Sequence, residues 1–147
     1  MKKIKLHWQI ALSLTAALAV SLLAKFLAAG QDLDDLAQLE QVHALKTGGL
    51  YAAAGALGGL CAGASVDEVD ALERYGLAFG VGFQHADDVL DDDQPKLRAQ
   101  AMARMQVLLG TCRDEAARFG ERGEALRGLT KWLDVRAQKA ATGARLE

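Results

Sequence analysis

The sequence has few of the residues that interrupt helices or favour strands. It contains one proline, few aromatic residues and sparse β-branched residues, whereas alanine, leucine and glycine are abundant. Because alanine and leucine are strong helix formers, this composition argues against a sheet-based fold and predicts an all-α protein. A chain of 147 residues is long enough for one domain with a sizeable core.

Neither sign of charge dominates the chain. The net charge is −2, and acids and bases are interspersed except in a basic N-terminus, a central acidic cluster and a basic tail that we expect to fray from Arg136 onward. No nucleic-acid partner is therefore expected. Cys61 and Cys112 lack the spacing of a metal site and lie in apolar helical surroundings, so both are predicted to be buried free thiols.

Residues 1–29 form the longest hydrophobic segment. Three lysines at positions 2, 3 and 5 precede an uncharged run over residues 6–24, which is long enough to cross a bilayer. The segment resembles the first transmembrane helix of dicarboxylate and glutamate symporters. Four alternatives stay open: a membrane anchor through residues 6–29, a cleaved secretory signal, a core helix, or an artefact of gene truncation or fusion. The localisation is accordingly bacterial-type membrane-associated or cytoplasmic, with the side of the membrane unresolved.

Helical patterns follow one another after residue 30. An amphipathic pattern runs to residue 45, and the glycine pair at 48–49 predicts a kink or close packing before the small apolar run over residues 50–63. Ser65 and Glu68 form a capping box, which predicts that a helix starts at Val66. Pro95 is placed for the first turn of the next helix. That helix has an apolar stripe at Leu97, Ala101, Met105, Leu108, Cys112, Ala116 and Phe119, and a last helix has one at Leu126, Leu129, Leu133 and Ala137.

Residues 79–93 concentrate polar groups at the end of an apolar helix. Helical spacing places Gln84, Asp91 and either Asp87 or Asp88 on one face. Clustered carboxylates repel one another, and a cation that prefers oxygen ligands, such as Mg²⁺, relieves that repulsion. The alternative is an acidic helix end in solvent, although the C-terminus of a helix disfavours negative charge.

A second set of polar residues lies at the break before the small apolar run. Lys46 and Thr47 are followed by the glycine pair. A lysine and a threonine at a break in a buried helix can hold a phosphate. The alternative is a surface lysine whose aliphatic stem covers apolar side chains.

Three segments, in this order, resemble the trans-polyprenyl diphosphate synthases, the family that makes farnesyl, geranylgeranyl and longer isoprenoid diphosphates. Gly30, Gln31 and Asp34 resemble its Gly-Gln-x-x-Asp segment, residues 39–48 its Lys-Thr-Gly helix, and residues 83–91 its second aspartate-rich motif. The resemblance implies the C-terminal half of such an enzyme. It would form a partial isoprenoid-synthase-type helical bundle over residues 30–141, with a flexible tail at 142–147.

The resemblance also implies roles for particular residues. In the family the second aspartate-rich motif holds Mg²⁺ against a substrate diphosphate, and this role passes to Asp87, Asp88 and Asp91. Lysine, threonine and glutamine contact or orient the phosphates, which implies catalytic and diphosphate-binding roles for Lys46, Thr47 and Gln84. His85 stands where the family usually has an aliphatic residue. We expect His85 and His43 to be packed or ordinary helix residues and not ligands.

The implied reaction is Mg²⁺-dependent prenyl transfer from an allylic diphosphate to isopentenyl diphosphate. A complete family member also carries a first aspartate-rich motif on an N-terminal half, and residues 1–29 stand in its place. We therefore expect the chain to be inactive alone, and whether it is an enzyme stays open. The expected partners are a prenyl diphosphate and either a second copy, giving a homodimer as in the family, or a chain that supplies the missing half. The alternative function is a non-catalytic, membrane-tethered or self-associating helical remnant.

Overall fold

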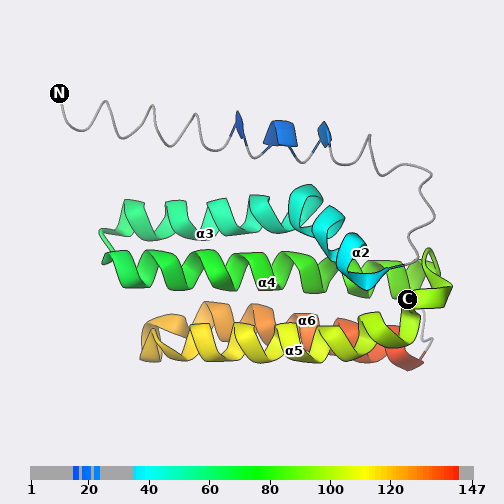
Figure 1. Cartoon of the computed structure of the whole chain (residues 1–147). Coiled ribbons are helices and arrows are strands. Elements are labelled where there is room, and N and C mark those ends of the chain that lie inside the picture. Colours follow the sequence, from blue (N-terminus) through cyan, green and yellow to red (C-terminus); the bar gives the residue numbers. More distant parts are fainter. Residues whose placement is uncertain (1–14, 17, 21, 24–34, 143–147) are drawn as a thin grey trace.

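The computed structural model describes residues 15–16, 18–20, 22–23 and 35–142, and within these ranges every regular element is a helix (Figure 1). The prediction of an all-α protein is confirmed. The elements are α2 (Leu36–His43), a π-helical turn η1 (Ala44–Gly48), α3 (Gly49–Ala62), α4 (Val66–Asp91), the 3-10 turn η2 (Pro95–Leu97), α5 (Arg98–Ala117), the 3-10 turn η3 (Gly120–Gly123) and α6 (Glu124–Thr142).

Helix α4 is the centre of the fold. It contacts α2, η1, α3, α5 and α6, with α3 along one side and α5 and α6 along the other (Figure 1). The predicted capping box is confirmed, because the Glu68 amide donates to Ser65 Oγ and the Ser65 amide donates to the Glu68 carboxylate at 2.9 Å. The helix ends at Asp91 and is capped by Asp92, whose φ of 58° is left-handed.

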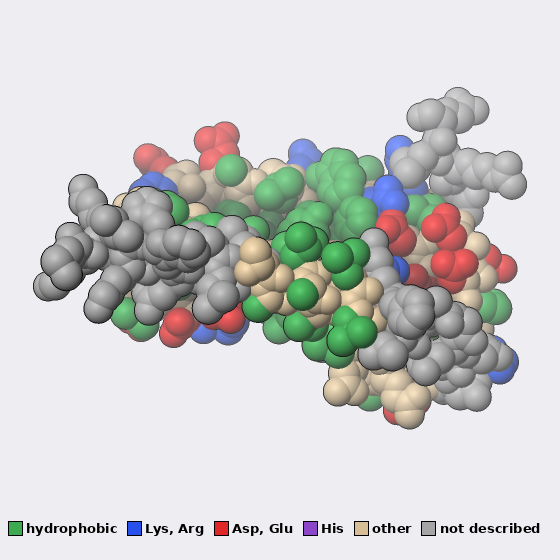
Figure 2. Space-filling model, turned by 90° about the horizontal axis from the view of Figure 1, so that it is seen from above, with side chains coloured by type: hydrophobic (Ala, Val, Ile, Leu, Met, Phe, Trp, Pro, Cys, Tyr) green, Lys and Arg blue, Asp and Glu red, His purple; other side chains and the backbone are tan. Residues whose placement is uncertain are grey.

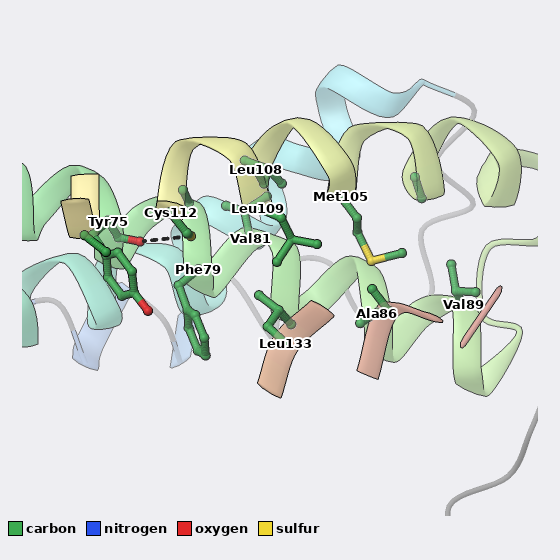
Figure 3. Packing of buried hydrophobic residues seen from close by; sticks show 14 residues of the cluster. Tyr75, Phe79, Val81, Ala86, Val89, Met105, Leu108, Leu109, Cys112 and Leu133 are labelled. Carbon is green, nitrogen blue, oxygen red and sulfur yellow. Dashed lines mark hydrogen bonds between the residues drawn. The ribbon is translucent and has the colours of Figure 1, made fainter. Parts of the chain in front are cut away.

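The hydrophobic core lies between α4, α5 and α6 (Figure 3). Every residue of the stripe predicted for α5 is buried, which confirms the helical spacing. In Figure 3, Met105, Leu109 and Leu133 point into the same layer as Phe79. The Cys112 thiol is fully buried and donates to the Tyr75 carbonyl at 3.9 Å, so Cys112 is the buried free thiol that was expected.

The α3–α4 interface depends on glycine. A Cβ atom on Gly76 would lie 2.3 Å from the Tyr51 carbonyl oxygen, and one on Gly80 would lie 2.8 Å from the Gly48 Cα atom. No side chain fits between the two backbones at these points, so the helices approach more closely than larger residues permit. The predicted kink or close packing at the glycine pair is confirmed on both counts, since η1 is the kink and Gly48 packs on α4.

Two sequence predictions are wrong. Cys61 is exposed because α3 buries only the side that faces α4, where Ala52 and Gly59 lie. The expected fraying from Arg136 onward is not observed. Helix α6 continues to Thr142, because Leu133 and Ala137 are buried and hold its last turns on the core.

The predicted hydrophobic helix over residues 1–29 falls mostly outside the described residues. Those described, at 15–16, 18–20 and 22–23, are helical and exposed. Gly30, Gln31, Asp34 and the predicted tail beyond Thr142 also lie outside the described ranges. Among the residues that the structure does describe, no helix has the length and apolar character needed to cross a membrane.

Candidate functional site

The acidic motif occupies the last two turns of α4, and its aspartates face different neighbours. Asp88 Oδ2 lies 2.9 Å from His43 Nε2, at the end of α2. Asp87 accepts a short hydrogen bond from Arg136 on α6. Asp91 is exposed. The first two carboxylates are therefore each paired with a basic side chain from a different helix.

Two histidines form a buried contact beneath this motif. The rings of His43 and His85 meet edge to face with centroids 4.8 Å apart, and the residues are 2% and 0% exposed. His85 Nε2 lies 3.2 Å from Glu40 Oε1, which also accepts from Arg104 Nε at 2.7 Å. Neither histidine Nδ1 atom has a partner within the described part of the chain.

The surroundings shift the pKa of His85 and of Glu40. Burial lowers the pKa of His85, and the neighbouring His43 lowers it further, so His85 is held as the neutral imidazole. Burial works to raise the pKa of Glu40, but the hydrogen bonds from Arg104 and His85 outweigh it and the pKa is lowered. The group is thus a neutral histidine bonded to a carboxylate whose charge Arg104 balances, which fixes α2 to α4 and α5.

Arg136 is held by a carboxylate and by two aromatic rings. One edge donates to Asp87, and the Cζ atom lies 5.1 Å from the centre of the Phe83 ring and 5.8 Å from that of Trp132. The two rings are stacked with centroids 6.0 Å apart. A cation placed over aromatic faces is attracted by their quadrupoles, so the rings and the carboxylate fix its position together.

The residues expected to bind phosphate lie on η1 and on the turn of α4 before the acidic motif. Lys46 and Thr47 are partly buried on η1, and Gln84 is buried on α4. A Cβ atom on Gly48 would lie 3.1 Å from a Val81 methyl group, which places η1 directly against α4. Gly48 packs against α4 about two turns before the contact between His43 and Asp88, and Lys46 and Thr47 lie on η1 between these two contacts.

An apolar groove of about 450 Å³ lies between α3, α4 and α6, along the part of α4 that precedes the motif. It is lined by Tyr51, Ala54, Gly55, Leu72, Tyr75, Gly76, Phe79, Phe83, Leu126, Leu129 and Trp132, none of which is charged. Phe83 and Trp132 are also the rings beneath Arg136, so the groove reaches that cation. Figure 2 views the face that carries α3 and shows hydrophobic side chains over its middle and acidic side chains toward the end at which α4 terminates.

The donor chemistry of the motif fits Mg²⁺, which prefers carboxylate oxygens. Across the described residues, however, no group of three or more histidine, cysteine, aspartate or glutamate side chains is arranged to hold a metal ion. Mg²⁺ commonly uses one or two carboxylates and takes its other ligands from phosphate and water. Asp87, Asp88 and Asp91 are the carboxylates of the motif that could supply such ligands.

Sequence reasoning missed four members of this site, namely Glu40, His43, Arg104 and Arg136. One signal was present for Arg136. It follows Trp132 by one helical turn, as Asp87 follows Phe83, so each helix carries an aromatic and a charged residue at matching spacing. His43 lies one turn before Lys46, but nothing in the sequence indicated that it meets Asp88.

Comparison with known proteins gives a family match. The profile described as Polyprenyl synthetase matches residues 16–98, more than half of the chain. The match begins inside the segment that was predicted to be a separate hydrophobic helix, and it ends before most of α5 and all of α6.

Several curated relatives resemble the same region. Nonaprenyl diphosphate synthase of Mycobacterium tuberculosis is 43% identical over 63 residues, which cover 43% of this chain and 19% of that protein. Geranylgeranyl diphosphate synthase of Methanosarcina mazei is 51% identical over 51 residues, covering 35% of this chain and 16% of that protein. The heterodimeric geranylgeranyl pyrophosphate synthase large subunit 1 of Arabidopsis thaliana is 41% identical over 64 residues, covering 42% and 17%. The chain thus spans less than a fifth of each of these relatives.

Proposed function

The chain belongs to the polyprenyl synthetase family, and from this we propose that it takes part in prenyl transfer from an allylic diphosphate to isopentenyl diphosphate. The observation that carries the proposal is the 2.9 Å contact between His43 and Asp88. It joins the helix of the Lys-Thr-Gly segment to the aspartate motif, two segments that the family uses on one diphosphate.

In this proposal Asp87, Asp88 and Asp91 hold Mg²⁺, and Lys46, Thr47 and Gln84 bind or orient the phosphates. When bound, Mg²⁺ offsets the negative charge that grows on a departing diphosphate. Lys46 adds a fixed positive charge to the same end. The packing of η1, which carries Lys46 and Thr47, against α4, which carries Gln84, supports this division of roles.

The apolar groove supports the same function. Its lining has no charged side chain, and the hydroxyl of Tyr75 is already bonded to the Leu126 carbonyl at 2.7 Å. A prenyl chain in the groove would place its diphosphate toward Arg136 and the acidic motif. Exclusion of water from such a groove would protect a carbocation from being quenched.

A partner is part of the proposal. We expect either a second copy or a chain with a first aspartate-rich motif to complete the site. Exposed apolar side chains on α3 and α6, including Leu60, Leu129 and Trp132, are suited to being covered by such a partner.

Labelled isopentenyl diphosphate and allylic diphosphates of increasing length test the reaction. We expect Mg²⁺-dependent product from the chain combined with a candidate partner, and a loss of about 100-fold when Asp87→Asn and Asp91→Asn are combined. Asp114→Asn, at an exposed aspartate on α5, is the matched control and should keep full activity. An absence of product from every combination would rule out the enzymatic function.

One observation favours the non-catalytic alternative. Asp87 and Asp88 are already paired with Arg136 and His43, so a metal must compete for both carboxylates. Because such a remnant could keep one Mg²⁺–diphosphate site or none, calorimetry with inorganic pyrophosphate and Mg²⁺ tests whether the site is retained. Heat that disappears in the Asp87→Ala and Asp91→Ala double variant supports the diphosphate site, whereas no heat in the parent chain supports the remnant.

A further inference from the structure

Arg136 is one feature of the site that the family match does not account for. It lies on α6, outside residues 16–98, yet its side chain reaches the acidic motif. The side chain is 19% exposed and that of Asp87 is 28% exposed, so water screens the pair only partly. The stacked rings of Phe83 and Trp132 support the guanidinium from the other side.

The guanidinium of Arg136 has N–H donors that its contact with Asp87 does not use. Arginine carries five N–H groups in a planar fork, and the contact with Asp87 is made from Nη2. The Nε atom is buried and has no hydrogen-bond partner among the described residues. A buried donor without an acceptor is unfavourable, so this position favours the arrival of an anion with more than one oxygen.

We infer that Arg136 is a diphosphate-binding residue that pairs with Asp87 in the free protein and turns to the diphosphate when Mg²⁺ and diphosphate bind together. The inference rests on the proposed function of the acidic motif. Ligands that share one Mg²⁺ are close neighbours, so a guanidinium bonded to Asp87 is within reach of a diphosphate held by the same ion. A planar arginine matches phosphate oxygens better than a lysine does.

The inference requires that Arg136 has opposite effects on two ligands. Mg²⁺ alone is a cation and competes with Arg136 for Asp87, so the arginine weakens its binding. A diphosphate is an anion and gains charge-assisted hydrogen bonds from the same side chain, so the arginine strengthens its binding. A residue that merely supports the fold would change both affinities in the same direction.

Calorimetric titration of the full chain measures both effects. In Arg136→Gln, Mg²⁺ alone is expected to bind about fivefold more tightly, as for the loss of a partly screened ion pair. Inorganic pyrophosphate at saturating Mg²⁺ is expected to bind at least about tenfold more weakly. Arg113→Gln removes another arginine, one that pairs across α5 and α6 with Asp134 at 3.3 Å, and both affinities should stay unchanged.

The affinities of Arg136→Gln for the two ligands decide whether Arg136 has this role. Weaker binding of both ligands, or no change in either, would overturn the role of Arg136. Failure of the proposed function looks different, because the parent chain would then bind no pyrophosphate while Arg136→Gln still tightened Mg²⁺ binding. Should Arg136→Gln unfold, Arg136→Lys keeps the charge and loses the planar fork. Weaker pyrophosphate binding with unchanged Mg²⁺ binding is then expected, and equal affinity for pyrophosphate would overturn the inference.

Discussion

The close approach of α3 to α4 makes Gly76 one of the most sensitive positions in the chain. In Gly76→Ala the new methyl group would lie 2.3 Å from the Tyr51 carbonyl oxygen, 2.6 Å from its carbonyl carbon and 2.7 Å from the Ala52 nitrogen. All three atoms are backbone, so no side chain can rotate away and α3 itself must move.

The magnitude follows from two opposing terms. Overpacking of this kind costs about 1–3 kcal/mol, and a clash with backbone belongs at the upper end. Replacing glycine by alanine within a helix stabilises that helix by up to about 1 kcal/mol. We therefore expect Gly76→Ala to lower the free energy of unfolding by about 2 kcal/mol.

Gly58→Ala provides the matched control. Gly58 lies on α3, and nothing is within 4 Å of a Cβ atom built there, so only the helix preference acts. The control should be more stable than the parent by about 0.5–1 kcal/mol. Urea unfolding followed by circular dichroism measures both variants. If Gly76→Ala were as stable as Gly58→Ala, the account of a backbone-to-backbone interface would be refuted.

Two further predictions concern ionisation. The backbone hydrogen bond from Ser65, together with Arg122, lowers the pKa of Glu68 from 4.5 to about 2, so its stabilising effect is present above pH 4.5 and is lost as the pH falls toward 2. Glu68→Gln should flatten the pH dependence of urea unfolding over that interval, and an unchanged slope would contradict the capping contact. Burial raises the pKa of the Cys112 thiol to about 12, whereas Cys61 is exposed. A thiol reagent should modify Cys61 in the native chain and Cys112 only in denaturant, and rapid reaction of both in native buffer would show that the core opens.

Local features of the fold were predictable from the sequence. The capping box at Ser65 and Glu68 and the stripe of α5 both depend on residues a few positions apart, and both are confirmed. The error at Arg136 has a simple cause. The basic charge of the tail predicted fraying, although the apolar stripe through Leu133 and Ala137 extends past Arg136.

The pairing of the aspartates was not predictable in the same way. Periodicity places Asp87 and Asp88 on adjacent faces of one helix, but their partners come from segments 49 and 45 residues away. The register between the helices determines which side chains come into contact with the two aspartates. Glycine backbone contacts set that register for α3 and α4, and a sequence pattern does not encode distances of that kind.

The π-helical turn η1 also determines which side chains face α4. His43 contacts Asp88, and five positions later Gly48 packs against Val81, so both point to the same neighbour. An ordinary α-helix advances about 100° per residue and would set these two positions about 140° apart. The bond from the Gly49 amide to the Ala44 carbonyl widens the turn, so that residues five apart stack as residues four apart do elsewhere. Removing one residue here would rotate His43 away from the acidic motif while leaving every side chain of α3 in place. The number of residues in this turn therefore determines which side chains of α2 face α4.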